Sequence, residues 1–205
     1  MKRVLNSGSI RLPQVKGTEE GLRANLNNNW TPELFAENVY SVWPEELDKI
    51  LFSFEIKAPL LIYLALQDVN LGTLSRLEDQ DRQVAYLPAF YYTKDCSTFS
   101  QMDAKTCNVN NTKLFNFYTA AFNFYNNILE DGMCVEQAQL VLPQGIFINF
   151  LWEVTAKDLF KFVAEHYNDS PEMYGYCSTF VLYLEENLPL VTKWVRANRW
   201  QNTAL

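Results

Sequence analysis

The sequence contains few of the residues on which common catalytic motifs depend. It has one histidine, His166, and seven glycines among 205 residues. No segment forms a glycine-rich phosphate loop, a G-x-S-x-G elbow or an H-E-x-x-H motif. The four cysteines include no C-x-x-C pair, which argues against a zinc site and a disulfide framework. These absences exclude kinase, hydrolase and zinc-protease classes, and we expect no metal.

Positive charge is also scarce, with 17 basic against 24 acidic residues and a net charge of −7. Such a chain repels nucleic acids and anionic lipids unless a local basic patch intervenes. The nearest candidates, Lys193, Arg196 and Arg199, have the spacing of a solvated helix face. No run of 18 or more apolar residues and no apolar N-terminal segment occurs, so neither a membrane span nor a signal peptide is expected. We expect a cytoplasmic protein that binds neither nucleic acid nor membranes.

Apolar residues are abundant enough for a sizeable core. The hydrophobic fraction is 48% and the aromatic fraction 15%, which excludes a disordered chain. A length of 205 residues fits one domain covering 1–205.

In the first half of the chain, hydrophobic periodicity and capping residues predict short elements. Helices are expected after Thr18 and Thr31, and a half-buried strand over 51–57. The run LLIYLALQ that follows Pro59 predicts a buried helix, and 67–83 an exposed, charged excursion. Residues 93–112 are polar and without period, which predicts a long surface loop.

In the second half, a clear apolar stripe predicts a helix from Leu114 to Asp131. A strand is expected over 146–154, then a helix capped by Thr155 and another opened by Pro171 and interrupted at Pro189. Strands among helices without regular alternation predict an α+β fold in which helices cover a small mixed or antiparallel sheet.

Two segments resemble the flavin-dependent thymidylate synthases, the ThyX family. FSFEIKAP at 52–59 is similar to the strand before the family's signature helix. AQLVLPQGIFINFLWEVTAKDLFKFV at 138–163 is similar to its pattern of A-R-x-V-L-P followed by an aromatic strand and a helix. The resemblance covers about 43–188 and implies a ThyX-like fold, FAD for hydride transfer, a folate donor, one-carbon transfer to C5 of a pyrimidine nucleotide, and a homotetramer.

The charged residues of the family signature are replaced. Asp68-Val69-Asn70 stands in the place of R-H-R, and Thr73 is the only conservative replacement in the segment that follows. Gln139 replaces the arginine of A-R-x-V-L-P, and Thr155 the strand-ending asparagine. Because those cations meet flavin and nucleotide phosphates in the family, their combined loss predicts poor affinity for dUMP and FAD.

The resemblance nevertheless places candidate binding residues on this sequence, while no catalytic residue is assigned. Those for the cofactor are Lys49, Thr73, Arg76 and Arg82, and those for the substrate are Lys157, His166 and Tyr167. Each has a structural alternative. Arg76 and Arg82 lie in a segment rich in acidic residues that balance their charge, and a lone histidine usually serves packing or a local hydrogen bond.

Two functions remain open. In the first, the protein is a flavin- and folate-dependent C5 methyl- or hydroxymethyltransferase of pyrimidine deoxynucleotide metabolism, whose classical dUMP methylation is lost or altered in favour of another pyrimidine nucleotide. In the second, it is a catalytically inactive binding or assembly protein. The inactive protein could pair with an active paralogue. The resemblance implies a homotetramer, and the high aromatic content is consistent with interfaces, which favour aromatic residues.

Overall fold

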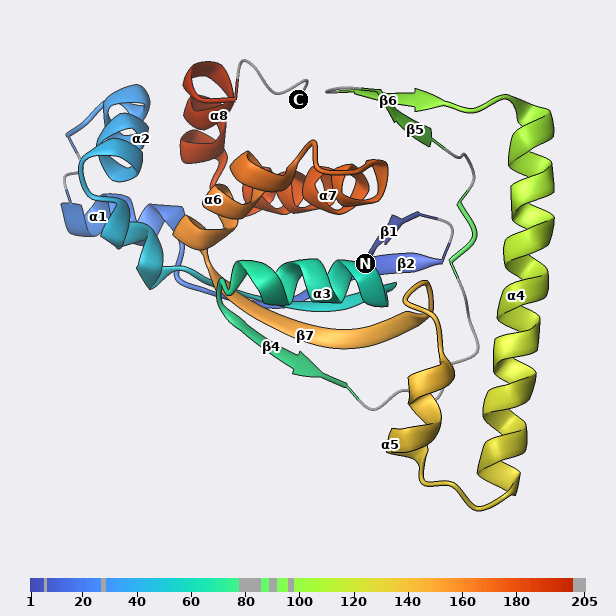
Figure 1. Ribbon diagram of the computed structural model, residues 1–205. Coiled ribbons are helices and arrows are strands. Elements are labelled where there is room, and N and C mark those ends of the chain that lie inside the picture. Colours follow the sequence, from blue (N-terminus) through green and yellow to red (C-terminus); the bar gives the residue numbers. More distant parts are fainter. Residues whose placement is uncertain (6, 27–28, 78–85, 89–91, 96–97, 201–205) are drawn as a thin grey trace.

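The computed structural model describes residues 1–205 except 6, 27–28, 78–85, 89–91, 96–97 and 201–205. Its centre is a five-stranded antiparallel sheet in the order β1-β2-β3-β7-β4. The strands are β1 (Lys2–Val4), β2 (Gly8–Lys16), β3 (Leu51–Pro59), β4 (Thr73–Arg76) and β7 (Phe147–Thr155). All nine residues of β3 pair with β7, so this pair forms the middle of the sheet (Figure 1).

Alternation along β3 and β7 gives the sheet two different faces. One carries large apolar side chains that are fully buried, among them Phe54, Phe150 and Trp152. The other carries Glu55, Asn149 and further polar residues, and we call it the open face because no described helix covers it.

Three helices cover the apolar face, namely α3 (Leu60–Val69), α6 (Ala156–His166) and α7 (Pro171–Asn187) (Figure 1). Contacts between aromatic rings connect the sheet to these helices. The ring centroid of Trp152 lies 5.3 Å from that of Phe162 in α6 and 5.2 Å from that of Phe180 in α7. The ring centroid of Phe150 lies 5.1 Å from that of Tyr63 in α3. Such aromatic pairs add to the stability that burial alone supplies.

A second helical group lies beside this core, formed by α1 (Glu19–Leu26), α2 (Pro32–Ser41), the 3₁₀ helix η1 (Pro44–Lys49) and α8 (Pro189–Asn198). Thr31 caps α2 by accepting the N–H of Leu34 at 3.3 Å, with Pro32 in the first turn.

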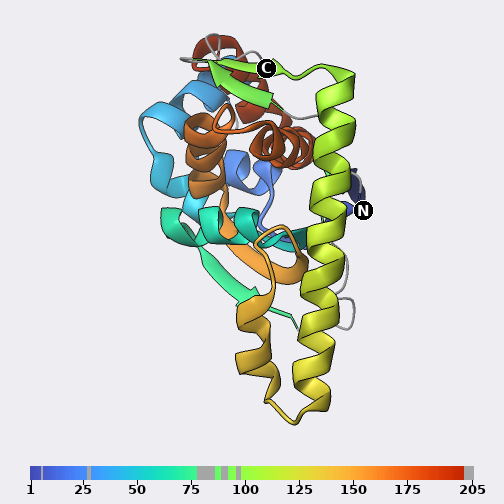
Figure 2. The same cartoon turned by 45° about the vertical axis from the view of Figure 1, so that its right-hand side comes forward.

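The remaining elements extend away from the core. These are the hairpin β5 (Tyr92–Asp95) and β6 (Thr98–Gln101), the helix α4 (Ala104–Glu130), the short helix α5 (Val135–Ala138) and the 3₁₀ helix η2 (Gln139–Val141). Figures 1 and 2 show α4 as a long helix standing at one side of the molecule, with α5 beside its lower end.

The α+β fold class and most predicted elements are confirmed. Helices follow Thr18 and Thr31, and the strands predicted at 51–57 and 146–154 are β3 and β7. Thr155 caps α6.

One prediction for an individual segment is wrong, and two are confirmed only in part. Residues 93–112 are not a loop: they contain β5, β6 and the first turns of α4, which begins ten residues before Leu114 because Asp103 caps it through the N–H of Thr106. The excursion over 67–83 is mostly exposed over 67–77, as predicted, but this part contains the end of α3 and the strand β4, and 78–83 lie outside the described residues. The helix α3 buries only Ile62 and Leu66, so it is half-exposed.

The ends of the chain also differ from expectation. The strands β1 and β2 were not predicted, because Pro13 interrupts their alternation. Pro189 opens the separate helix α8, since α7 has already ended at Asn187.

Candidate functional site

The segment that replaces the family's cationic signature lies at the C-terminal end of α3. Asp68 is exposed in the last turn, and Asn70 caps the helix in the left-handed conformation with φ 53°. Asparagine tolerates this conformation better than most residues. A helix C-terminus carries partial negative charge, which attracts cations and repels anions. Asp68 adds to this charge, so the end of α3 repels a phosphate.

Gly72 then directs the chain into β4. Its φ is +71°, and a Cβ at this position would lie 2.2 Å from the backbone oxygen of Glu153 on β7. Only glycine permits so close an approach. The indole Nε1 of Trp152 donates to the backbone oxygen of Leu71 at 2.8 Å, so the same turn is also held from the core. The backbone that follows the signature position is therefore held firmly in place, although the charged side chains of the family signature have been replaced.

Lys49 and Lys157 lie on neighbouring elements, the 3₁₀ helix η1 and the helix α6. Each has an acidic partner. Lys49 ends η1 and its Nζ lies 2.6 Å from Oε1 of Glu46. Lys157 opens α6 and its Nζ lies 2.7 Å from Oδ2 of Asp48, which is also in η1. The hydrogen bond to Asp48 raises the pKa of Lys157. Both lysine side chains are exposed to solvent, so an anion would compete with these carboxylates.

His166 and Tyr167 end α6 in different environments. Nδ1 of His166 lies 2.6 Å from Oδ2 of Asp169, and its ring packs 5.0 Å from Phe162. Tyr167 is only 3% exposed, and its phenol oxygen accepts a hydrogen bond from Ser178 at 3.2 Å. Burial raises the pKa of Tyr167 to about 12. Within one chain, Tyr167 therefore has a packing role.

Two further candidates, Thr73 and Arg76, lie on the edge strand β4. Thr73 begins β4 directly across from Glu153, whose carboxylate accepts a hydrogen bond from Ser53 at 3.1 Å. Arg76 ends β4 as an exposed side chain, and no described carboxylate pairs with it. Arg82 lies outside the described residues. Gln139 is half-buried in η2.

Within the described part of one chain, the candidates form no single cluster. Lys49 and Lys157 share the edge formed by η1 and α6, whereas Thr73 and Arg76 lie on β4 and His166 at the far end of α6. No group of three or more metal-binding side chains occurs among the described residues. None of the helices traced in the described ranges has the length and apolar character of a membrane span.

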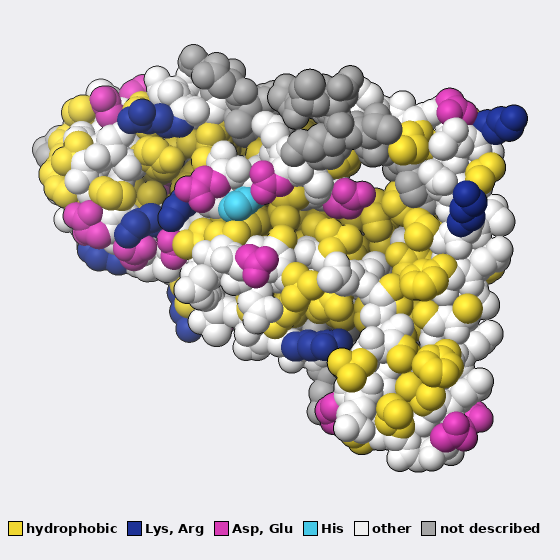
Figure 3. Space-filling view, viewed as in Figure 1, with side chains coloured by type: hydrophobic (Ala, Val, Ile, Leu, Met, Phe, Trp, Pro, Cys, Tyr) yellow, Lys and Arg dark blue, Asp and Glu magenta, His cyan; other side chains and the backbone are white. Residues whose placement is uncertain are grey.

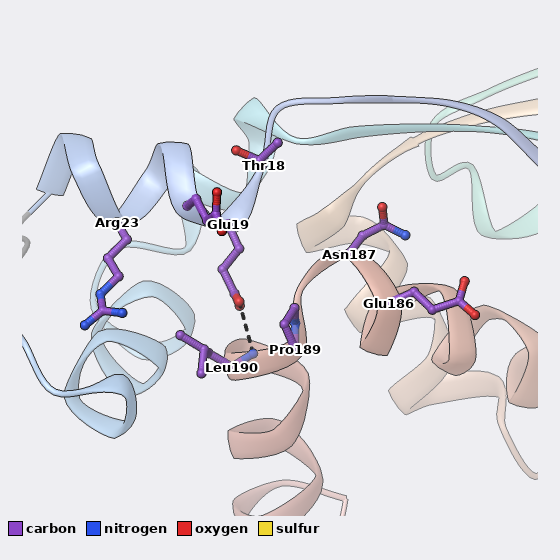
Figure 4. Close-up of a pocket in the computed structure, with 8 residues that line it drawn as sticks. Thr18, Glu19, Arg23, Glu186, Asn187, Pro189 and Leu190 are labelled. Atoms are coloured by element: carbon purple, nitrogen blue, oxygen red, sulfur yellow. Dashed lines mark hydrogen bonds between the residues drawn. The ribbon is translucent and has the colours of Figure 1, made fainter.

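A cavity of about 480 Å³ lies between α1 and the junction of α7 with α8 (Figure 4). Its wall includes Glu19, whose carboxylate accepts the N–H groups of Leu190 and Val191 at 3.1 and 2.9 Å. Burial raises the pKa of Glu19, while these two N–H groups and Arg23 lower it. Glu19 thus caps α8 from a distant part of the chain. Sequence reasoning missed this contact, for which the local sequence carries no signal.

Comparisons with known proteins identify the family of this chain. The family model described as thymidylate synthase complementing protein matches residues 20–181. A flavin-dependent thymidylate synthase of Borreliella burgdorferi is 20% identical over 159 residues, which cover 70% of this chain and 60% of that relative. One of Thermotoga neapolitana is 24% identical over 169 residues, covering 78% and 76% respectively. This chain therefore spans less than two thirds of the length of the first relative.

A solved structure shows the same fold. The UMP/dUMP methylase PolB of Streptomyces cacaoi, bound with 5-Br UMP, superposes with a TM-score of 0.81 over 96% of this chain and 97% of that one, at 15% identity. Since the family model spans the replaced signature segment, the β3–β7 centre and most of α7, the chain belongs to the family of thymidylate synthase complementing proteins, as a diverged member of the ThyX family.

Proposed function

We propose that this protein keeps the scaffold of the family for pyrimidine nucleotide metabolism, while classical flavin-dependent dUMP methylation is lost or altered. The observation that carries the proposal is Asp68, an exposed carboxylate at the negative end of α3 where the resemblance expects an arginine. In the family, that arginine would meet a phosphate with a charge-assisted hydrogen bond. Here both the side chain and the helix dipole oppose the phosphate.

The altered activity that we favour is one-carbon transfer to C5 of another pyrimidine nucleotide. The fold is shared with a UMP/dUMP methylase, so a ribonucleotide is a reasonable first substrate to test. By analogy with the family, FAD would transfer the hydride and a folate would donate the one-carbon unit. Lys49, Thr73, Arg76 and Arg82 would then contact the cofactor. Lys157, His166 and Tyr167 would contact the nucleotide, with Tyr167 requiring a rearrangement of its buried ring.

The second candidate function is an inactive binding or assembly protein. It is favoured by the ion pairs of Lys49 and Lys157, which give each cation at the η1–α6 edge an acidic partner. A flavin phosphate would have to compete with these carboxylates for both lysines.

Turnover assays separate these functions. We expect no thymidylate when the purified protein is given dUMP, FAD, a reductant and a folate one-carbon donor, because the phosphate contacts are missing. The product is measured by mass spectrometry, with UMP in a parallel reaction. Methylated UMP would support the altered activity, and nucleotide binding without any product would support the inactive protein. Stoichiometric conversion of dUMP would contradict the proposal.

We also propose that the protein is a homotetramer in which α4 is covered by another chain. This helix has 27 residues but buries only Cys107, Tyr118 and Tyr125. Phe115, Phe117 and Phe124 are 58%, 55% and 54% exposed. Figure 3 shows hydrophobic side chains continuing from α4 onto the adjoining middle of the molecule. Contiguous apolar surface of this kind marks interaction sites.

Light scattering tests the assembly. We expect the mass of four chains for the unmodified protein, and a smaller species for the double variant Phe117→Asp/Phe124→Asp, because it introduces charge into the apolar face. Asn116→Asp/Asn123→Asp is the matched control, since it adds the same charge to exposed positions one residue earlier on the same helix. A monomeric unmodified protein, or equal dissociation of both variants, would count against this assembly.

A further inference from the structure

The open face of the sheet contains a cavity of about 320 Å³. The strand register builds it, because Ser9 on β2 lies beside Lys57 on β3, and Lys57 lies beside Asn149 on β7. In the next row Arg11 lies beside Glu55. A hydroxyl, an ammonium, an amide and a guanidinium therefore line one concavity. Adjacent strands are about 4.8 Å apart, so these groups are within reach of one small ligand.

The charges in this cavity do not cancel. Nη1 of Arg11 lies 3.3 Å from Oε2 of Glu55, and both side chains are well exposed. Exposed pairs of this kind are weak, and a guanidinium has further N–H donors to offer. The ammonium of Lys57 has no carboxylate partner among the residues that the structure describes. Among the described residues that line the cavity, one positive charge therefore has no acidic partner.

The position of Lys57 is fixed from the opposite side of the sheet. Its backbone oxygen accepts the phenol hydrogen of the buried Tyr176 at 3.0 Å. The residue is half-buried. It belongs to β3, which pairs with a neighbouring strand on each side, so its ammonium extends from a rigid strand. Sites on such elements hold a ligand more precisely than sites on loops.

We propose that this cavity binds the phosphate group of a small molecule. Lys57 would supply the charge, Arg11 would donate from N–H groups other than the one that faces Glu55, and the Ser9 hydroxyl would offer a further hydrogen bond. The volume lies at the lower end of the range for small-molecule pockets. This site lies on a different face from Asp68 and does not depend on flavin or folate chemistry.

Titration with inorganic phosphate, followed by NMR at constant ionic strength, tests the site. We expect saturable shifts at the amides of Ser9, Lys57 and Asn149. Lys57→Met should weaken this binding at least about tenfold, because it removes the unpaired charge and keeps the aliphatic stem. Lys16→Met is the control, since Lys16 is an exposed lysine on the same sheet outside the cavity. Arg11→Gln is a second variant at an exposed position, and it should also weaken binding.

Parallel titrations with UMP and uridine identify the source of the phosphate. If UMP binds more tightly than phosphate and loses affinity in Lys57→Met, the site takes a nucleotide. If UMP binds no more tightly, the site takes free phosphate. Absence of saturable phosphate binding, or equal losses in Lys57→Met and Lys16→Met, would overturn the proposal whatever the turnover assays show.

Discussion

Trp152→Ala is expected to lower the free energy of unfolding by about 3–5 kcal/mol, the usual range for truncating a large buried aromatic residue. Trp152 is fully buried at the centre of β7, and its ring contacts Phe54, Phe162 and Phe180 at centroid distances of 6.1, 5.3 and 5.2 Å. Alanine would leave a cavity where the sheet meets α6 and α7. Domain stability is only about 5–15 kcal/mol, so this loss is a large fraction of the total.

Urea denaturation followed by circular dichroism measures the effect, with Trp152→Phe as the comparison. Phenylalanine keeps an aromatic ring but removes the donor to Leu71. Both variants lose this hydrogen bond, but phenylalanine keeps most of the ring packing, so its loss of stability should be smaller than that of alanine. A loss below about 1 kcal/mol in Trp152→Ala would show that this residue does not anchor the core.

Gly72→Ala is expected to cost about 3 kcal/mol and to detach β4 from β7. A non-glycine residue with positive φ costs about 1–3 kcal/mol. In addition, the new Cβ would lie 2.2 Å from the backbone oxygen of Glu153, and a strand backbone yields little. Because β4 follows directly after the signature position, hydrogen exchange should increase at Ser75, which lies opposite Leu151, and at Leu77, whose N–H donates to the backbone oxygen of Asn149 at 3.0 Å.

Gly132→Ala provides the matched control for this prediction. Gly132 has φ +91°, but no heavy atom lies within 4 Å of a Cβ built there. It should therefore show only the conformational cost, about 1 kcal/mol. Equal losses at the two glycines would mean that the close approach of β4 to β7 is not what requires Gly72.

Local sequence patterns predicted the elements that have a clear hydrophobic periodicity or a recognisable capping residue. The strands β3 and β7 and the helix α6 have clear alternation or a threonine cap, and each appears near its predicted position. The first turns of α4 were missed because residues 104–113 are mostly polar and only Cys107 among them is buried. Helix formation there depends on the Asp103 cap, which period-based reasoning does not see.

The candidate residues were harder to predict than the fold. Their positions came from the family resemblance, whereas their ion pairs depend on contacts between distant segments. Lys157 meets Asp48 across 109 residues of sequence, and Glu19 reaches Val191 across 172. The cavity around Arg11 and Lys57 depends on the register of β2, whose irregularity between Arg11 and Gln14 hid the strand.

The carboxylate of Asp68 at the end of α3 should weaken FAD binding, and a titration measures this effect. Titration of the unmodified protein with FAD, monitored by flavin fluorescence and equilibrium dialysis, should give a dissociation constant weaker than about 0.1 mM. Asp68→Arg should strengthen binding of FAD or dUMP, and the same change at the exposed Asp131 should not. Tight, stoichiometric FAD binding by the unmodified protein, with a dissociation constant below about 1 μM, would contradict the claim.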